Sequence, residues 1–381
     1  MGVGIGALVT SIAMGGAVLV GFLVLLSLGF VILFIYWARE VGRPLPLLKR
    51  VLQNPILSPI PEHPWESEAV FNPAAIVDQG RVHLFYRALG SDGISRIGYG
   101  VSGDGVHFER LSYPVYDQNN NPRLAPPKKL SYATLTYNRD LYASGGGWGG
   151  VEDPRAVILG NHLYMSFSAF EGWDSIRITL TALPLHSLRA HNWNWKKPLY
   201  LSPRQQTNKN WVLFPEKIHG KYAILHALTP APQIAYVDSL DTLPEPIQSN
   251  SYRSGRPGHW DAFVRGAAAP PIRTEVGWLL LYHGMNPEEN IGYKVGAMIL
   301  DFNDPTHILF RSASPILEPV EWYENDWKAG VVYASGAVVF QDQLFVYYGG
   351  GDKRIAVART PMREFIRKLQ NNEHIVLQSE V

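Results

Sequence analysis

The sequence predicts an all-β fold, a five-bladed β-propeller that follows an N-terminal transmembrane helix. Three observations lead to this prediction. The first 38 residues contain no charged side chain. From residue 67 to residue 362, short apolar or alternating runs are broken by Gly, Pro, Asn and Asp, as is typical of strands. A unit of three to four such strands recurs five times, at a spacing of roughly 45–65 residues, which is typical of propeller blades.

The apolar N-terminal run, GGAVLVGFLVLLSLGFVILFIYW, exceeds the roughly 20 apolar residues that cross a bilayer. A secretory signal would carry a basic start and a shorter apolar core, and a buried helix is rarely apolar on every face. We therefore expect residues 1–38 to form a single-pass membrane anchor. The next segment is basic, so the positive-inside rule predicts that the C-terminal body lies in the cytoplasm. Its charged residues are Arg39, Glu40, Arg43, Lys49 and Arg50.

After the anchor, we expect a basic, Pro-rich linker over residues 39–66, the propeller over 67–362, and a C-terminal helix and tail over 363–381. The five units contain the segments FNPAAI, EDPRAV, FPEKI, APPI and ASGAVV, each followed by a tight polar turn. Propeller blades surround a central channel, and we expect the first strand of each to line it. Polar residues on these strands would then meet in one axial pocket. A β-sandwich is the alternative, but it does not explain the repeated position of the turn.

Composition excludes several classes of function. The net charge of +1, with basic residues scattered along the chain, gives no sign of nucleic-acid binding. The absence of cysteine excludes disulfides, thiolate metal sites and cysteine nucleophiles. Because no HxH or HExxH spacing occurs, we expect no metal.

The residues expected at the axis are mainly charged and aromatic. Aromatic rings stack on sugar faces while charged groups bind hydroxyls, and cations suit an anion such as phosphate. A carboxylic acid that protonates a glycosidic oxygen needs a raised pKa, which an apolar surround supplies. The charged residues and His283 at these strand positions are Arg87, Glu152, Asp153, Arg155, Glu216, Lys217, His283 and Asp352, and the aromatic ones are Phe85, Tyr86, Phe214, Tyr282, Tyr347 and Tyr348.

Within this set Asp153 is a candidate for such an acid. Pro154 is expected to hold it in an extended backbone and so to fix the direction of its side chain. Two structural alternatives remain. The Glu-Asp-Pro segment suits a turn, and Arg155 and Lys217 suit ion pairs with Glu152 and Glu216.

Eight segments, in this order, resemble glycoside hydrolase family 130, the β-mannoside phosphorylases and β-mannosidases. They are NPILSP, FNPAAI, FYRA, GVEDPRAV, LFPEKIHGKY, PPIRTEVGWLLLYHG, LFRSASPILEP and VYYGGGDKRIAVA, and they span roughly residues 54–360. The resemblance implies a five-bladed propeller with Asp153 as general acid, acting in the phosphorylases through a sugar hydroxyl. The substrate- and phosphate-binding residues that we predict with it are Asn72, Arg87, Arg155, Glu216, Lys217, Tyr282, His283 and Asp352.

The chain departs from the phosphorylase pattern at two positions. Ala227 stands where many members have an arginine, and Val264 where they have a lysine. Arg265 follows Val264, but neighbouring strand residues face opposite sides. Hydrolysis would need a base, for which Glu216, Asp261 and Glu324 are the candidates.

The sequence thus predicts an enzyme that cleaves β-mannosides or related glycosides with inversion, by phosphorolysis to α-mannose 1-phosphate or by hydrolysis. A transferase acting on a membrane glycan and a non-catalytic propeller that binds glycans or proteins are the alternatives. No cofactor is expected, with inorganic phosphate as the co-substrate. The expected partners are a β-linked oligosaccharide and the membrane, without nucleic acid, and a homo-oligomer is left open.

Overall fold

The computed structural model describes residues 25–33, 48–120, 149–171, 175–250, 254–289 and 292–371. The chain divides into two units, Met1–Leu45 with Ser379–Val381, and Pro46–Gln378. In the first unit residues 25–33 are helical, and the rest of the predicted anchor over 1–38 lies outside the described residues. No helix among the described residues combines the length and apolar character that crossing a membrane requires.

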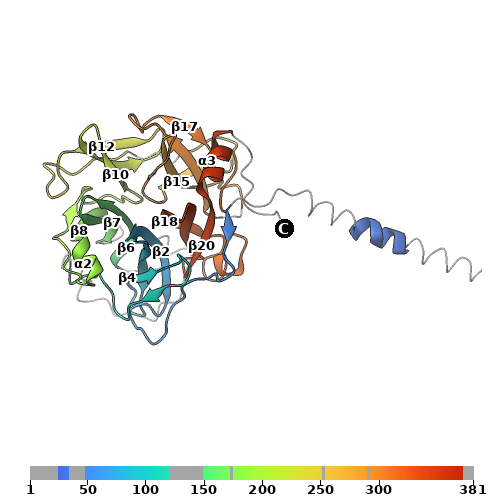
Figure 1. Ribbon diagram of the computed structural model, residues 1–381, viewed down its shortest axis with the longest axis horizontal. Helices are drawn as coiled ribbons and strands as arrows, with labels where there is room; N and C mark the ends of the chain where they lie inside the picture. Colours follow the sequence, from blue (N-terminus) through green and yellow to red (C-terminus); the bar gives the residue numbers. More distant parts are fainter. Residues whose placement is uncertain are drawn as a thin grey trace, which may run out of the picture. The chain divides into compact units, whose positions relative to one another are not determined.

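The second unit consists mostly of antiparallel strands, which fall into five groups in chain order (Figure 1). The first two groups are β2 (Ala69–Asp78), β3 (Arg81–Leu89), β4 (Ile94–Ser102) and β5 (Glu109–Arg110), then β6 (Gly149–Leu159), β7 (His162–Phe170), β8 (Ile176–Pro184) and β9 (Leu199–Tyr200). A short parallel pairing of β4 with β6 joins them into one eight-stranded sheet.

The other three groups are separate sheets. They comprise β10 (Val212–Ile218), β11 (Lys221–Ala227) and β12 (Gln233–Val237); β13 (Phe263–Ala267), β14 (Ile272–Arg273), β15 (Trp278–Met285), β16 (Lys294–Leu300) and β17 (Ile308–Arg311); and β18 (Val332–Phe340), β19 (Gln343–Gly350) and β20 (Arg354–Pro361), to which β1 (Lys49–Arg50) adds an outer strand. The helical elements are α2 (Leu185–Arg189), η2 (Trp322–Glu324) and α3 (Met362–Gln370).

Tight turns close the hairpins where the sequence predicts them. Gln79 and Gly80 join β2 to β3 with φ of 48° and 68°, and His219 and Gly220 join β10 to β11 with φ of 51° and 77°. Positive φ at both central residues is the geometry whose twist matches that of the flanking strands. The prediction of mostly β structure is confirmed.

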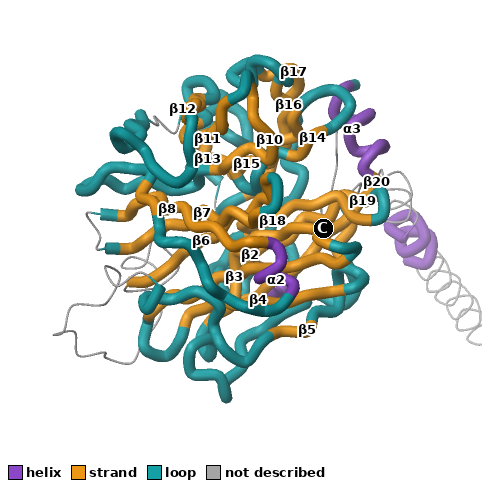
Figure 2. Tube along the Cα trace, turned by 60° about the vertical axis from the view of Figure 1, so that its left-hand side comes forward, coloured by secondary structure: helices purple, strands orange, loops and turns teal. Residues whose placement is uncertain are grey.

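Apolar side chains form core clusters between consecutive groups of strands. One cluster joins the first and second groups, others join the second to the third, the third to the fourth and the fourth to the fifth, and a further cluster joins the fifth to the first. The first strands accordingly lie side by side, β18 against β2, β2 against β6 and β6 against β10 (Figure 2).

The first strands of all five groups are interrupted by bulges or irregularities, at which the pairing shifts register. The shifts fall between Phe71 and Ala74 in β2, between Glu152 and Arg155 in β6, between Leu213 and Lys217 in β10, between Val264 and Gly266 in β13, and between Ala334 and Gly336 in β18. A bulge bends the strand and redirects one side chain. Three polar side chains of the pocket described next, Asn72, Asp153 and Arg265, lie at these bulges.

Candidate active site

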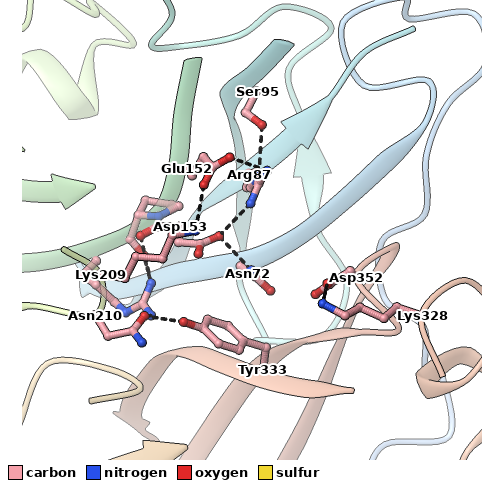
Figure 3. Close-up of polar contacts among 12 residues, drawn as sticks. Asn72, Arg87, Ser95, Glu152, Asp153, Lys209, Asn210, Lys328, Tyr333 and Asp352 are labelled. Atoms are coloured by element: carbon pink, nitrogen blue, oxygen red, sulfur yellow. Dashed lines mark hydrogen bonds and ion pairs between the residues drawn. The ribbon is translucent and has the colours of Figure 1, made fainter. Parts of the chain in front are cut away.

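An open pocket lies where the bulged first strands meet. It is lined by Phe71, Asn72, Arg87, Asp153, Lys209, Arg265, Tyr293, Lys328, Tyr333 and Asp352. These residues come from all five groups of strands and the loops that precede them. Figure 3 shows the polar side chains pointing toward one another across the pocket.

Asp153 lies at the centre of this group of side chains (Figure 3). Its Oδ1 accepts hydrogen bonds from Asn72 Nδ2 at 2.8 Å and from Arg87 Nη1 at 3.3 Å. Burial raises the pKa of its carboxyl, but the charges of Arg87, Lys209 and Arg155 and the Asn72 hydrogen bond outweigh this and lower the pKa to about 2. The expectation of a raised pKa is therefore wrong, because cations surround the buried acid.

The backbone of Asp153 is not extended, contrary to the expectation from Pro154. Its φ is 51°, and Asn72, at the corresponding bulge of β2, has a φ of 47°. Asn and Asp tolerate this left-handed conformation better than other non-glycine residues. The bulge, rather than Pro154, sets the direction of the Asp153 side chain.

Behind Asp153, Glu152 holds two of the cations. It is fully buried and accepts hydrogen bonds from Arg87 Nη2 at 2.8 Å and from Lys209 Nζ at 3.1 Å. Arg87 Nε also donates to Ser95 Oγ at 3.0 Å. Glu152 thus pairs with Arg87 and Lys209, and the predicted pair with Arg155 is not the contact that forms.

Arg155 instead lies behind the pocket lining and contacts two of its residues, Asp153 and Tyr333. Its Nη1 donates to the backbone carbonyl of Asp153 at 2.9 Å, and its guanidinium lies over the ring of Tyr333. The Tyr333 hydroxyl donates to Asn210 Oδ1, and the ring stacks on His283 with 3.9 Å between centroids. Burial and the charge of Arg155 hold the pKa of His283 well below its usual range, so its imidazole is neutral.

Asp352 lies on another side of the pocket and forms an ion pair with Lys328 at 3.2 Å. The structure therefore brings together Asn72, Arg87, Asp153 and Asp352 in the pocket lining, with Arg155 and His283 in the layer behind.

Two predicted site residues lie beside a hairpin turn. Glu216 is exposed and pairs with Arg273 at 3.1 Å, and Lys217 is exposed and lies over the ring of Tyr222. The register of β10 shifts between Leu213 and Lys217, which places both beside the hairpin turn and not at the pocket. In the third group, the residue that lines the pocket is Lys209, in the loop before β10. Its neighbour Asn210 has a positive φ of 64°, as Asn72 and Asp153 do in the first and second groups.

Tyr282 and the candidate bases of a hydrolase are also outside the pocket. The Tyr282 hydroxyl donates to Asp261 at 2.7 Å, and Asp261 pairs with Arg256 and Arg311. Glu324 is fully buried and is bound by Arg50, Tyr348 and two backbone N–H groups. These carboxylates are structural, and neither lines the pocket.

Arg265 does face the pocket, contrary to the expectation from strand alternation. It lies at the bulge between Val264 and Gly266, which breaks the two-residue period, while Val264 packs in a core cluster. Among the described residues, no carboxylate lies within 4.0 Å of its guanidinium. Arg265 thus supplies a cation at the position next to Val264, which stands where the sequence analysis expected a lysine.

The sequence analysis missed Lys209, Asn210, Tyr293, Lys328 and Tyr333. Lys328 and Tyr293 precede strands in loops, where no periodicity signals their position.

Comparisons with known proteins find relatives along most of the chain. A family model described as beta-1,4-mannooligosaccharide phosphorylase matches residues 139–371. The chain is 36% identical over 327 residues to the 1,2-beta-oligomannan phosphorylase of a Thermoanaerobacter species, a match that covers 83% of this chain and 98% of the relative. It is also 36% identical over 325 residues to the beta-1,2-mannobiose phosphorylase of that organism, covering 82% and 96%.

Two solved structures are similar along most of their length. The beta-1,2-mannobiose phosphorylase of Listeria innocua in complex with beta-1,2-mannobiose has a TM-score of 0.62 at 26% identity, covering 85% of this chain and 99% of that one. The second structure is described as belonging to a family of mannoside phosphorylases that contains glycoside hydrolases targeting beta-1,2 mannosidic linkages in Candida mannan. It has a TM-score of 0.65 at 25% identity and covers 84% and 95%.

Proposed function

The chain belongs to glycoside hydrolase family 130, and from that premise we propose that it is an enzyme that cleaves β-1,2-linked mannosides by phosphorolysis. The products would be α-mannose 1-phosphate and a shortened glycan. The two relatives at 36% identity, which act on 1,2-beta-oligomannan and beta-1,2-mannobiose, support the linkage.

The charge of the pocket is the observation that carries phosphorolysis. An inverting hydrolase needs a second carboxylate, about 6.5–9.5 Å from the acid, to activate water. Among the described residues that line the pocket, the carboxylates are Asp153 and Asp352, and Lys328 neutralises Asp352. Arg87, Lys209 and Arg265 line the same space and suit a phosphate dianion, which is itself the nucleophile.

In this mechanism a phosphate oxygen attacks the anomeric carbon while the bond to the glycosidic oxygen breaks. The substrate excludes water from Asp153, which raises its pKa, so that a proton is taken up with the sugar. Asp153 gives this proton to a sugar hydroxyl, which passes its own proton to the leaving oxygen. Arg87 and Asn72 orient the carboxylate, and Arg265 and Lys209 hold the phosphate.

The reverse reaction tests this proposal. A phosphorylase incubated with α-mannose 1-phosphate and mannose makes a β-mannoside and releases inorganic phosphate, whereas a hydrolase does not. We expect mannobiose with a 1,2 linkage, and none from Asp153→Asn. Failure of the wild-type protein to form any disaccharide, together with release of free mannose from β-mannosides, would contradict the proposal.

We propose that the body is a five-bladed propeller, with the pocket at its axis, over the predicted range 67–362. The five groups of antiparallel strands and the core cluster shared by the last and first groups support this arrangement. The linker would include β1, which pairs with the last group of strands.

We also propose that residues 1–38 anchor the enzyme in a membrane, with the body in the cytoplasm. The support is the uncharged N-terminal run and the basic segment that follows it. A reporter fused at the C-terminus tests the orientation. Recovery of the full-length chain in the supernatant of washed membranes would contradict anchoring.

A further inference from the structure

A second pocket adjoins the first and shares Lys209 and Arg265 with it. It offers about 140 Å³ of free volume, close to the roughly 150 Å³ of a cavity that accommodates benzene. Besides the shared residues, its lining is mainly neutral and comprises Gln206, Thr207, Asn208, Asn210, Trp211, Leu225, His226, Ala227, Leu228, Ser249, Gly266 and Ala267.

One polar group in this second pocket has no partner. Asn208 is only 7% exposed, and its side-chain Nδ2 is buried without a hydrogen-bond acceptor among the described residues. By contrast, another polar side chain of this pocket, His226, does have a partner: its Nδ1 lies 3.0 Å from Ser249 Oγ. A buried amide without a partner costs free energy unless a ligand satisfies it. The second pocket is therefore suited to a ligand that accepts a hydrogen bond.

The two pockets present an ordered series of chemical environments. The first offers Asn72, Asp153 and Asp352 to sugar hydroxyls, and the shared boundary offers the cations Lys209 and Arg265. Beyond the boundary the lining contains no carboxylate and no further Lys or Arg among the described residues. A ligand that matches this order is a sugar, then an anion, then an uncharged group.

We propose that the second pocket holds the organic substituent of a phosphate monoester, so that the enzyme also transfers mannose to phosphate monoesters. This inference rests on the proposed phosphorolysis and extends its acceptor class. A neutral oligosaccharide running through both pockets would leave Lys209 and Arg265 opposite uncharged sugar. Inorganic phosphate alone would leave the second pocket and Asn208 unfilled.

The reaction balances without another reactant. An oxygen of the monoester forms a bond to the anomeric carbon as the glycosidic bond breaks, and the product is a mannosyl phosphodiester. The leaving sugar gains one proton, and the monoanion of the monoester loses one as the diester forms. The substituent stays bound to phosphorus throughout, so no phosphorus–oxygen bond breaks.

The test offers β-1,2-mannobiose to the full-length enzyme with inorganic phosphate, with glycerol phosphate or phenyl phosphate, or with a polyprenyl phosphate in detergent. We expect a phosphodiester that resists phosphatase, detected by phosphorus NMR, in at least one monoester reaction. The soluble and lipid arms distinguish the two sources of the monoester. Mannose 1-phosphate from the phosphate arm with no diester in any other arm would overturn this inference and leave the proposed function intact. Failure in all arms would contradict the proposed function itself.

Two variants separate the second pocket from the first. Ala227→Leu fills the second pocket, and Asn208→Ala removes its unpartnered amide. We expect each to raise the KM for the monoester at least about tenfold relative to its KM for inorganic phosphate. Ala227→Ser, which adds little volume, is the control. Equal changes for both acceptors in Ala227→Leu and in Asn208→Ala would contradict the assignment.

Discussion

At Asp153 the backbone and the chemistry require the same kind of residue. The left-handed φ of 51° favours Asp or Asn, and only Asp supplies a carboxylate. Asp153→Asn therefore removes the acid without imposing backbone strain, whereas Asp153→Ala would add roughly 1–2 kcal/mol.

We predict that Asp153→Asn lowers kcat at least about a thousandfold while mannobiose binding changes less than about tenfold. The Asn72 and Arg87 donors remain, and the amide oxygen can accept one of them. Single-turnover kinetics and isothermal titration calorimetry check the two halves. A variant that turns over at more than a tenth of the wild-type rate would remove Asp153 from the mechanism.

The lowered pKa of Asp153 predicts a pH dependence for binding. The carboxylate of the free enzyme stays charged above about pH 2, below the ordinary value near 3.9. Because Asp153 takes up a proton as the sugar binds, the Kd for mannobiose should rise with pH above this value, by up to about tenfold per pH unit, until the pKa of the complex is passed. Asp153→Asn should lack this rise, and in Asn72→Ala, which removes a stabilising hydrogen bond, the rise should begin at a higher pH. A wild-type Kd that is independent of pH between about 4 and 8 would contradict proton uptake at Asp153.

Arg265 and Arg273 provide a matched comparison of two arginines. Arg265 lines the pocket, whereas Arg273 is exposed and pairs with Glu216. We predict that Arg265→Ala raises the KM for phosphate at least about tenfold, with a smaller change for mannobiose. Initial-rate kinetics with each substrate varied in turn checks this, and Arg273→Ala should match the wild type. Equal phosphate KM values in Arg265→Ala and wild type would place the phosphate elsewhere.

At the scale of the strands, bulges bring Asn72, Asp153 and Arg265 to the pocket. Gly266 has a φ of 139°, and an added Cβ would lie 2.9 Å from Asn210 Cβ. We predict that Gly266→Ala costs about 1–3 kcal/mol in the free energy of unfolding, because its backbone conformation is strained for other residues. It should also lower kcat/KM for phosphate, because it displaces Asn210 and the adjacent Arg265.

Gly220→Ala is the control for this effect. Gly220 also has a positive φ, of 77°, but an added Cβ meets nothing within 4 Å. It should lose stability in denaturant unfolding without losing activity. Gly266→Ala with full activity would show that the bulge does not position Arg265.

The bulges also explain why some site residues could be predicted from the sequence and others could not. Asn72, Arg87, Asp153 and Asp352 were predicted at the pocket, and they line it. Glu216 and Lys217 were misplaced because the irregularity in β10 shifts their register, and Arg265 was misjudged because a bulge breaks alternation. Strand periodicity predicts regular segments, but it carries no signal for a one- or two-residue shift.

For the whole body, one buried arrangement recurs in three groups of strands. A carboxylate before the first strand binds a tyrosine of the second long strand and an arginine of the outermost strand. The three sets are Glu66, Tyr86 and Arg110; Asp261, Tyr282 and Arg311; and Glu324, Tyr348 and Arg50. The third set shows that β1 serves as the outer strand of the last group, joining the two ends of the body.

We predict that Arg50→Met destabilises the body by about 3–5 kcal/mol, because it leaves Glu324 buried without its cation. The melting temperature should fall by at least about 5 °C. Lys49→Met, an exposed neighbour in the same strand, should melt like the wild type. Equal melting of both variants would show that β1 is not part of the cooperative fold. Soluble forms should accordingly begin before Lys49.

The central claim is that the Asp153 pocket uses phosphate in place of water. Its most direct test is proton NMR of the first product from β-1,2-mannobiose, with and without inorganic phosphate. We predict α-mannose 1-phosphate when phosphate is present and no cleavage when it is absent. Free mannose formed at the same rate in both conditions would contradict the claim and identify a hydrolase.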